Sequence, residues 1–499
     1  MAVISSTHAS PPAAVSDPLD ARALAARYFR VRARTVALAA PLSPEDAMVQ
    51  SMPEASPAKW HLAHTTWFFE RFVLGAEPGY RQVDPRWDHL FNSYYESLGP
   101  FHARPRRGVL SRPSLEEVLA YRREVDRRVG ERLAADALDG PVLRKLLLGT
   151  HHEQQHQELL LTDIKHAFWS NPLHPAYCDR APPAAGPGVP LEWTTVAATR
   201  ARVGAPRWPR ETDAFAYDNE SPRHEVLLQP YALASRPVTH GEFRLFIQDG
   251  GYRDPRLWLS DGWATVQAGR WERPLYWHED LEQVFTLHGW QPARSDAPAC
   301  HLSYFEADAF ARWAGARLPT EAEWEHVMAH SGAIGSEPVL HPQPVAARGD
   351  PGPVSGGVWE WTSSAYGPYP GYRPWPGAAG EYNGKFMNAQ WVLRGGSCLT
   401  PPDHLRPTYR NFFPSPARWQ FTGLRLAKDA LTSPRPPRRS PTWSTCSPAV
   451  SASPPTSLPG CRPSRAGCRP SISTMPAARS CSSASPTSPS TTSPAWRSR

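Results

Sequence analysis

Two histidines in the first third of the chain have the spacing of a metal chelate. His152 and His156 lie four residues apart in the run HHEQQHQE, between leucine-rich segments. On an α-helix, residues four apart share one face with their Cβ atoms about 6 Å apart, and Leu148 and Leu160 continue this stripe. Both imidazoles are therefore expected to face a helical core, where neutral imidazoles are good ligands for transition metals.

The competing interpretation is that these histidines are buried and satisfied by hydrogen bonds alone. The run contains three histidines, three glutamines and two glutamates. Burying so much polar surface without a use is costly, so we favour the metal site. Glu158 lies on another face of the same helix, and a role behind the ligands or in packing suits it better than ligation.

A third ligand must come from another helix, and the segment KWHLAHTTWFFE offers His61 and His64. Trp60, His64 and Phe68 share a stripe of period four, so His64 faces the same core as two aromatic side chains. His61, three residues away, is the weaker candidate. Three histidines leave coordination positions open, as in non-haem iron enzymes, but spacing alone does not separate iron from zinc.

Four helical segments are expected to position these histidines. They are residues 21–40, a segment from Ser56, one from Ser114 and one from Pro141. Ser56 and Pro57 form a suitable N-cap and first helical residue, and Ser114 with Glu117 has the spacing of a capping box. The pattern predicts a four-helix bundle within residues 21–178.

The rest of the chain divides into three kinds of segment by composition and hydrophobic pattern. Residues 179–190 are rich in Pro, Ala and Gly and are interpreted as a linker. Residues 191–429 have short segments and frequent turns with one clear helix, after Ser303, which indicates an α+β domain with much irregular structure. Residues 1–20 and 430–499 are predicted to be disordered, because they offer too little apolar surface to order themselves.

The composition excludes several classes of function. The net charge is +7, but residues 430–499 contain nine arginines and no acidic residue, so the remainder carries 7 − 9 = −2. No basic surface for nucleic acid is therefore expected. No apolar run of about 18 residues could span a membrane, and the N-terminus lacks the pattern of a secretory signal. We expect a cytoplasmic protein.

Eight motifs carry a resemblance to a known family. They occur in this order: SPAKWHLAHTTWFFE, LFNSYYESLGP, HHEQQHQELLLTDIKH, RLPTEAEWE, VWEWTSSAY, EYNGKFM, VLRGGSC and TYRNFFPSPARWQFTGLRLA. Over residues 20–429 the chain resembles the sulfoxide synthases of ergothioneine biosynthesis. The resemblance implies an N-terminal DinB-like four-helix bundle and a C-terminal domain of the formylglycine-generating-enzyme type, which has a C-type-lectin-like fold.

The resemblance also implies a reaction and a metal site. It implies that iron(II), Fe(2+), is bound by His64, His152 and His156, and that O2 is the oxidant both for C–S bond formation and for formation of the sulfoxide. One substrate would be hercynine (trimethylhistidine), whose imidazole sits at the iron with help from Gln155. Aromatic faces suit its trimethylammonium group.

The same resemblance implies where the hercynine ammonium lies. Asn411, Phe412 and Phe413 of the RNFF run stand at the matching place in this sequence. Without the resemblance, core packing is the alternative interpretation of these aromatic residues.

The resemblance implies that the second substrate is a thiol, either cysteine or γ-glutamylcysteine. Tyr94 and Tyr95 resemble the tyrosine pair of the branch that uses free cysteine, and one of them would deliver a proton to the reacting oxygen. Other members place this tyrosine in the C-terminal domain. Arg104 resembles the arginine that pairs with the donor carboxylate, and Arg106 and Arg107 are its rivals.

Three other functions are compatible with parts of the pattern. A formylglycine-generating oxidase would need a cysteine pair after RGGS, but Cys398 is followed by LTPPDHLRPTYRNFF, which contains no second cysteine. An ovothiol-type 5-histidylcysteine sulfoxide synthase usually carries an extra methyltransferase domain, for which no room remains. A non-enzymatic binding module would leave the three inward-facing histidines unexplained.

Two departures from the family are visible. Gly357 stands before VWEWT where an acidic residue or Asn is usual, which is expected to weaken a local turn. Residues 430–499 resemble no family segment, and their composition is that of a GC-rich gene read out of frame. We interpret them as a frameshifted end, which sequencing across the Asp429 codon would test. The sequence leaves the oligomeric state open.

Overall fold

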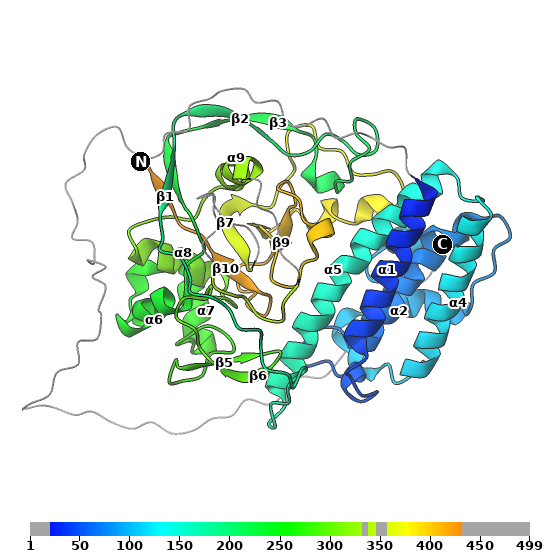
Figure 1. Ribbon diagram of the computed structural model, residues 1–499, viewed down its shortest axis with the longest axis horizontal. Coiled ribbons are helices and arrows are strands. Elements are labelled where there is room, and N and C mark those ends of the chain that lie inside the picture. The colour runs from blue at the N-terminus through cyan, green and yellow to red at the C-terminus, as the bar shows by residue number, and fades with distance from the viewer. Residues whose placement is uncertain (1–19, 332–337, 346–356, 431–499) are drawn as a thin grey trace, which may run out of the picture. The chain divides into compact units, whose positions relative to one another are not determined.

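The computed structural model describes residues 20–331, 338–345 and 357–430. The N-terminal part is helical, and the predicted four-helix bundle is confirmed (Figure 1). Its helices are α1 (Ala21–Ala39), α2 (Ala58–Phe72), α4 (Leu115–Ala134) and α5 (Gly140–Ser170), with a short α3 (Asp88–Phe91). Helix α2 packs against α4 and α5, and α1 packs against α5.

The helix starts follow from local capping. Ser114 and Glu117 form the predicted capping box at the start of α4. The prediction for α2 was wrong by one residue, because Pro57 occupies the N-cap position and Ala58 is the first helical residue. Ser56 instead accepts a hydrogen bond on its hydroxyl from Arg107, and its backbone N–H donates to Asp163. These tertiary contacts replace the cap.

The C-terminal part begins with the first strand at Trp193 and contains small sheets. The largest has the order β10-β7-β8-β9, with β10 parallel to β7 and the other pairs antiparallel. A second sheet has the order β1-β4-β11, and two hairpins pair β2 with β3 and β5 with β6. The strands are β1 (Trp193–Val196), β2 (Thr199–Val203), β3 (His224–Leu228), β4 (Tyr231–Ala234), β5 (Gln283–Thr286), β6 (Gly289–Pro292), β7 (Trp359–Ala365), β8 (Trp391–Arg394), β9 (Asn411–Phe413), β10 (Thr422–Leu424) and β11 (Ala427–Asp429).

The expectation of a single helix in this part was wrong. The described residues contain α6 (His240–Gln248), α7 (Ser260–Gly269), α8 (Tyr304–Trp313) and α9 (Glu321–Ser331). Helix α8 starts after Ser303, as predicted. Helix α6 starts with a capping box of Thr239 and Glu242, a sequence signal that was overlooked.

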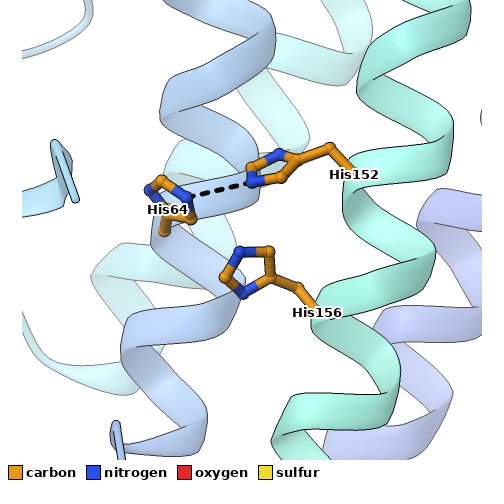
Figure 2. A group of neighbouring side chains, drawn as sticks. All are labelled: His64, His152 and His156. Atoms are coloured by element: carbon orange, nitrogen blue, oxygen red, sulfur yellow. Dashed lines mark hydrogen bonds between the residues drawn. The ribbon is translucent and has the colours of Figure 1, made fainter. Parts of the chain in front are cut away.

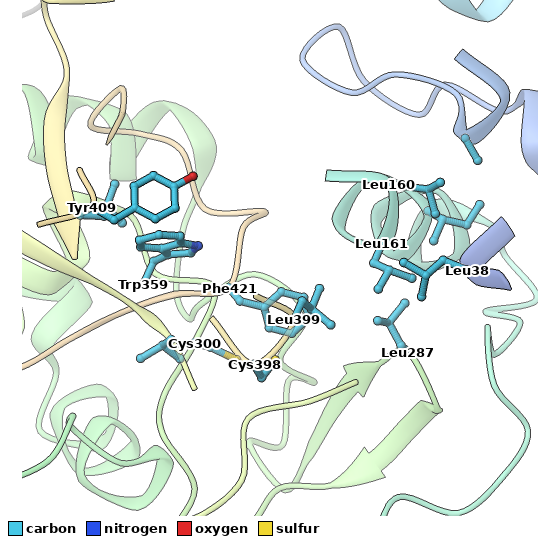
Figure 3. Packing of buried hydrophobic residues seen from close by; sticks show 14 of the residues in the cluster. Leu38, Leu160, Leu161, Leu287, Cys300, Trp359, Cys398, Leu399, Tyr409 and Phe421 are labelled. Atoms are coloured by element: carbon cyan, nitrogen blue, oxygen red, sulfur yellow. The ribbon is translucent and has the colours of Figure 1, made fainter. Parts of the chain in front are cut away.

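The bundle and the C-terminal part share one hydrophobic core. Figure 3 shows Leu160 and Leu161 of α5 close to Leu287 of the C-terminal part, within a cluster that also includes Phe421. Helix α5 therefore belongs to both parts. It supplies one face of the bundle core and one wall of the C-terminal core.

A buried carboxylate joins the two parts beside this core. Glu158 accepts hydrogen bonds from Trp359 Nε1 at 2.7 Å, Ser397 Oγ at 2.6 Å and Thr400 Oγ1 at 2.7 Å. Three donors compensate for the removal of one carboxylate from water. Glu158 thus has an inter-domain packing role, and these contacts anchor α5 to the VWEW and RGGSC segments.

Gly357 suits its turn better than the sequence suggested. Its φ of +103° lies in the left-handed region, where glycine has no Cβ to clash. The expected weakening of the turn is therefore wrong. The predicted disordered tail begins at residue 430, and residues 431–499 and 1–19 lie outside the described residues. Within the described residues, no helix is both long and apolar enough to cross a bilayer.

Candidate metal centre

Three histidine side chains meet inside the bundle, between α2 and α5. His64 comes from α2, and His152 and His156 come from successive turns of α5. One ring nitrogen from each lies within 4.8 Å of the others, and all three side chains are buried (Figure 2). Among the described residues this is the one cluster of at least three potential metal-ligating side chains at such distances.

The geometry of this cluster fits a transition-metal ion. His64 Nε2 and His152 Nε2 lie 3.2 Å apart. Two nitrogens bound to one ion at about 2.1 Å are separated by about 3.0–3.4 Å, depending on the coordination geometry. The separation therefore suits a shared metal but does not select between iron and zinc.

The protonation of the rings also suits a cation. Burial lowers the pKa of His64 and His156 well below the usual value, and it lowers the pKa of His152 to about 3. All three rings are therefore neutral at pH 7. His64 Nδ1 lies 2.6 Å from the Phe91 carbonyl oxygen, which can only accept, so this nitrogen carries the proton and Nε2 presents its lone pair to the cluster.

His61 orients one of the three rings, a role that was not anticipated from the sequence. His61 Nε2 lies 3.1 Å from Asp163 Oδ2, and His61 Nδ1 lies 2.8 Å from His156 Nδ1. Because the carboxylate accepts, His61 carries its proton on Nε2 and accepts at Nδ1 from His156. The Asp163–His61–His156 chain therefore leaves the Nε2 lone pair of His156 free for a metal.

The hydrogen bonds from Asp163 through His61 to His156 are expected to affect metal affinity. Changing Asp163 to Asn is expected to weaken metal binding by about 10- to 100-fold, because the carboxylate no longer holds His61 and His156 in the ligating tautomer. Anaerobic titration of the purified apoprotein with Fe(II) or Co(II) measures the change. Asp136→Asn, at an exposed position of the same domain, is the matched control. Equal affinities for the two variants would contradict the role of the chain.

Gln155 links the bundle to two tyrosines of the C-terminal domain. Its Nε2 donates to Tyr409 Oη at 2.5 Å, and Tyr382 Oη donates to its Oε1. The Tyr382 ring centroid lies 5.5 Å from that of His152. Tyr382 and Tyr409 were not selected from the sequence, although the quoted EYNGKFM and TYRNFF motifs contain them. Their closeness to Gln155 depends on the packing of the two domains.

The two adjacent tyrosines of the α2–α4 connection have different surroundings. Tyr95 is fully buried in the bundle, where its ring packs against Trp67 and Phe72. The Tyr94 ring faces the C-terminal domain, 6.3 Å from Tyr382 and 5.3 Å from Phe386 between centroids. Burial raises the pKa of both hydroxyls above the usual value, so each keeps its proton at neutral pH.

Strand β9 carries the RNFF residues and separates them. Successive residues of a strand point to opposite faces. Phe412 stacks on Tyr366 with centroids 4.0 Å apart and lies 6.0 Å from Phe386, so it joins the aromatic group that includes Tyr94. Phe413 packs on Trp419, at 5.8 Å, and Asn411 lies on the same side of the strand as Phe413. The structure thus associates Phe412, but not Phe413, with this aromatic group.

The arginine segment contains one buried and two exposed guanidinium groups. Arg104 and Arg106 are exposed, whereas only 1% of Arg107 is exposed. Arg107 donates to Ser56 Oγ at 2.8 Å and Ser93 Oγ at 3.1 Å. None of its hydrogen bonds or ion pairs within the described ranges is to a carboxylate.

Arg107 also lies next to the histidine cluster. Its guanidinium carbon is 3.4 Å from the centroid of the Trp60 ring, and that ring stacks on His64 with centroids 4.6 Å apart. Burial lowers the pKa of Arg107 well below its usual value. Asp163 is near enough to favour its charged form, but no carboxylate of the described residues contacts the guanidinium directly, and a buried cation of this kind is a strong site for a carboxylate ligand. The geometry therefore makes Arg107 a better candidate than Arg104 for the arginine that pairs with a carboxylate ligand.

Comparisons with known proteins agree with this two-part organisation. Residues 27–160 match the DinB superfamily, and residues 195–337 and 353–430 match the sulfatase-modifying factor enzyme 1-like domain. The chain is 32% identical over 422 residues to hercynine oxygenase of Mycolicibacterium smegmatis, covering 76% of this chain and 92% of that protein.

Two further relatives show how far the similarity extends. Hercynine oxygenase of Mycobacterium tuberculosis is 32% identical over 440 residues, covering 81% of this chain and 98% of that protein. The formylglycine-generating enzyme of Streptomyces coelicolor is 28% identical over 288 residues, covering 44% of this chain and 85% of that enzyme. The similarity to hercynine oxygenase covers both domains together, whereas the similarity to the formylglycine-generating enzyme covers less than half of this chain.

Proposed function

Because this chain belongs to the hercynine oxygenase family, we propose that it joins the sulfur of a cysteine-type thiol to the imidazole of hercynine in an iron(II)- and O2-dependent reaction. The chain is an oxygenase of ergothioneine biosynthesis, and the product would be a sulfoxide. The observation that carries the proposal is the buried cluster of three neutral histidines between α2 and α5. It provides a metal site in a protein whose relatives share both domains.

We assign iron(II) to His64, His152 and His156. When bound, iron would supply one-electron chemistry with O2. The protein supplies three neutral nitrogen donors. The Phe91 carbonyl sets the tautomer of His64, and Asp163 sets that of His156 through His61.

Hercynine is proposed to lie between α5 and the C-terminal domain. Gln155 would orient its imidazole, and Tyr382 and Tyr409 hold the Gln155 amide in place. Asn411, Phe412 and Phe413 were expected to contact the trimethylammonium group. The contacts of Phe412 with Tyr366 and Phe386 support it as the main aromatic surface of the three for this cation.

The proton for the reacting oxygen is proposed to come from a tyrosine of this interface. Tyr94 and Tyr95 are the candidates from the sequence, and Tyr382 joins them because its hydroxyl reaches Gln155 beside His152. Tyr95 packs on Trp67 and Phe72 inside the bundle and has no ring contact with the C-terminal domain among the described residues, which makes it the least suitable of the three.

Separate Tyr→Phe variants test this assignment. Loss of a general acid typically lowers turnover by about 100-fold or more, so we expect that effect for Tyr94→Phe or Tyr382→Phe. Tyr95→Phe is expected to leave kcat within a few-fold. Measuring kcat with both substrates saturating separates proton transfer from binding. Three variants with unchanged kcat would exclude all three hydroxyls.

The sulfur donor is cysteine or γ-glutamylcysteine, and one assay tests both the donor and the function. Anaerobically purified, iron(II)-loaded protein is mixed with hercynine, O2 and either thiol, and products are read by mass spectrometry. We expect hercynyl-cysteine sulfoxide from free cysteine. Product from γ-glutamylcysteine alone would keep the reaction class and change the donor. No sulfoxide with either thiol, despite bound iron, would contradict the proposed function.

The structure does not favour a formylglycine-generating activity. Burial raises the pKa of the Cys398 thiol well above its usual value, which makes it a poor nucleophile. Cys398 is also followed by no second cysteine up to Phe413.

A further inference from the structure

A separate cavity lies within the C-terminal domain and shares no residue with the histidine cluster of the bundle. Its volume is about 240 Å³, and the β5–β6 hairpin forms part of its wall. Its lining includes His240, Tyr276, Trp277, His301 and His341. It also includes Arg294, whose charge is paired with Asp296 at 3.0 Å. No Asp or Glu is among the described residues that line it.

Several polar atoms around this cavity lack a partner. His240 Nε2, Tyr276 Oη, His301 Nδ1 and His341 Nδ1 are buried and form no hydrogen bond with the described residues. Such atoms are rare in folded proteins and usually indicate a water, an ion or a ligand. Four of them around one cavity indicate a polar occupant.

Two of these residues also have unusual backbones. Tyr276 has a φ of +70° and His301 a φ of +67°, in the left-handed region that bulky residues seldom adopt. Such strain persists only where the surrounding structure imposes it, and it is common at ligand sites. The fold therefore maintains a strained backbone at two walls of this cavity.

A buried ammonium lies directly behind the cavity wall. Lys165 of α5 is fully buried, and its Nζ lies 2.5 Å from His301 Nε2. It also lies over the rings of Tyr276, at 4.5 Å, and Phe421, at 4.7 Å. No carboxylate within the described ranges forms an ion pair with it. Burial lowers the pKa of Lys165 to about 8, so most of it is charged at pH 7.

The hydrogen bond from Lys165 determines what His301 can offer a ligand. The ammonium can only donate, so His301 accepts at Nε2 and carries its own proton on Nδ1. A buried ammonium without a counter-charge is costly and is stabilised by a nearby anion. His301 thus carries an N–H donor on Nδ1 that is polarised by a positive charge behind it, with the backbone carbonyls of Trp419 and Gln420 near the ring but outside good hydrogen-bond geometry for Nδ1.

We propose that this cavity binds a small oxyanion, either a carboxylate or an inorganic oxyanion. The N–H of His301 and the hydroxyl of Tyr276 would donate to the anion, and Lys165 would supply the counter-charge through His301. A volume of about 240 Å³ accepts a molecule up to about the size of an amino acid. The absence of acidic side chains among the described lining residues removes the main source of repulsion for such a ligand.

The test uses the full-length, iron-loaded protein and three probes, sulfate, inorganic phosphate and acetate. Isothermal titration at constant ionic strength in chloride is expected to show one saturable site for at least one probe. Lys165→Met is expected to weaken this binding by about tenfold or more, because a charge-assisted interaction is lost. Lys145→Met, on the same helix and half-buried, is the matched control.

A second variant and a direct localisation complete the test. Ala297→Met places a flexible side chain into the cavity and is expected to reduce binding without removing any charge. If Lys165→Met does not fold, the effect of Ala297→Met on anion binding still tests the proposal. Selenate soaked into crystals is expected to give an anomalous peak beside His301. The absence of saturable binding for all three probes, unchanged affinity in the variants that fold, or a selenate peak elsewhere would overturn the proposal.

Discussion

Replacement of His152 by alanine is expected to release the bound iron and to lower kcat by at least about a thousandfold. The cluster offers three nitrogen donors, and the loss of one leaves a two-point chelate that binds the ion weakly. Several kcal/mol of metal-dependent stabilisation correspond to at least a thousandfold change in rate. Metal analysis of the purified variant, together with turnover in the sulfoxide assay, measures both effects.

The chain contains a matched control for this variant. His326 and His330 on α9 have the same spacing of four residues, and their ring centroids lie 5.1 Å apart. They are not part of a three-residue ligating cluster among the described residues. His330→Ala is therefore expected to keep its iron and its activity. Full iron content in His152→Ala, or iron loss in both variants, would refute the assignment of the metal site.

The second large effect is expected at Arg107. Arg107→Met is expected to raise the KM for the sulfur donor by a few hundredfold, because removing one side of a buried charge pair costs about 3–4 kcal/mol. The free protein is not expected to lose stability. It buries this guanidinium without a carboxylate partner, and an apolar side chain of similar length removes that cost. Donor-dependent kinetics and thermal unfolding of the same preparation measure both quantities.

Its two neighbours distinguish this role from a general effect of positive charge. Arg104→Met and Arg106→Met remove exposed guanidinium groups from the same segment. Both are expected to change the donor KM by only a few-fold, since exposed charges are screened by solvent. A large effect of Arg104→Met with little effect of Arg107→Met would reverse the assignment and restore the arginine chosen from the sequence.

The sequence alone was sufficient for features that depend on local spacing. The four bundle helices follow from periodicity and capping, and Ser114 with Glu117 shows this most directly. His152 and His156 were paired because residues four apart meet on any α-helix. His64 was preferred to His61 because it shares a stripe with Trp60 and Phe68. The structure places His64, and not His61, in the cluster.

The tertiary structure decided features that depend on which segments pack together. The sequence did not indicate that His61 contacts His156, because that contact joins two helices. The meeting of Gln155 with Tyr382 and Tyr409 requires the two domains to pack. Arg107 is buried whereas Arg104, three residues away, is exposed, and the amino-acid composition of this short segment does not predict which of the two is buried. Local periodicity thus determined the helices that carry the histidine cluster, while long-range packing determined the surroundings of the proposed metal and substrate sites.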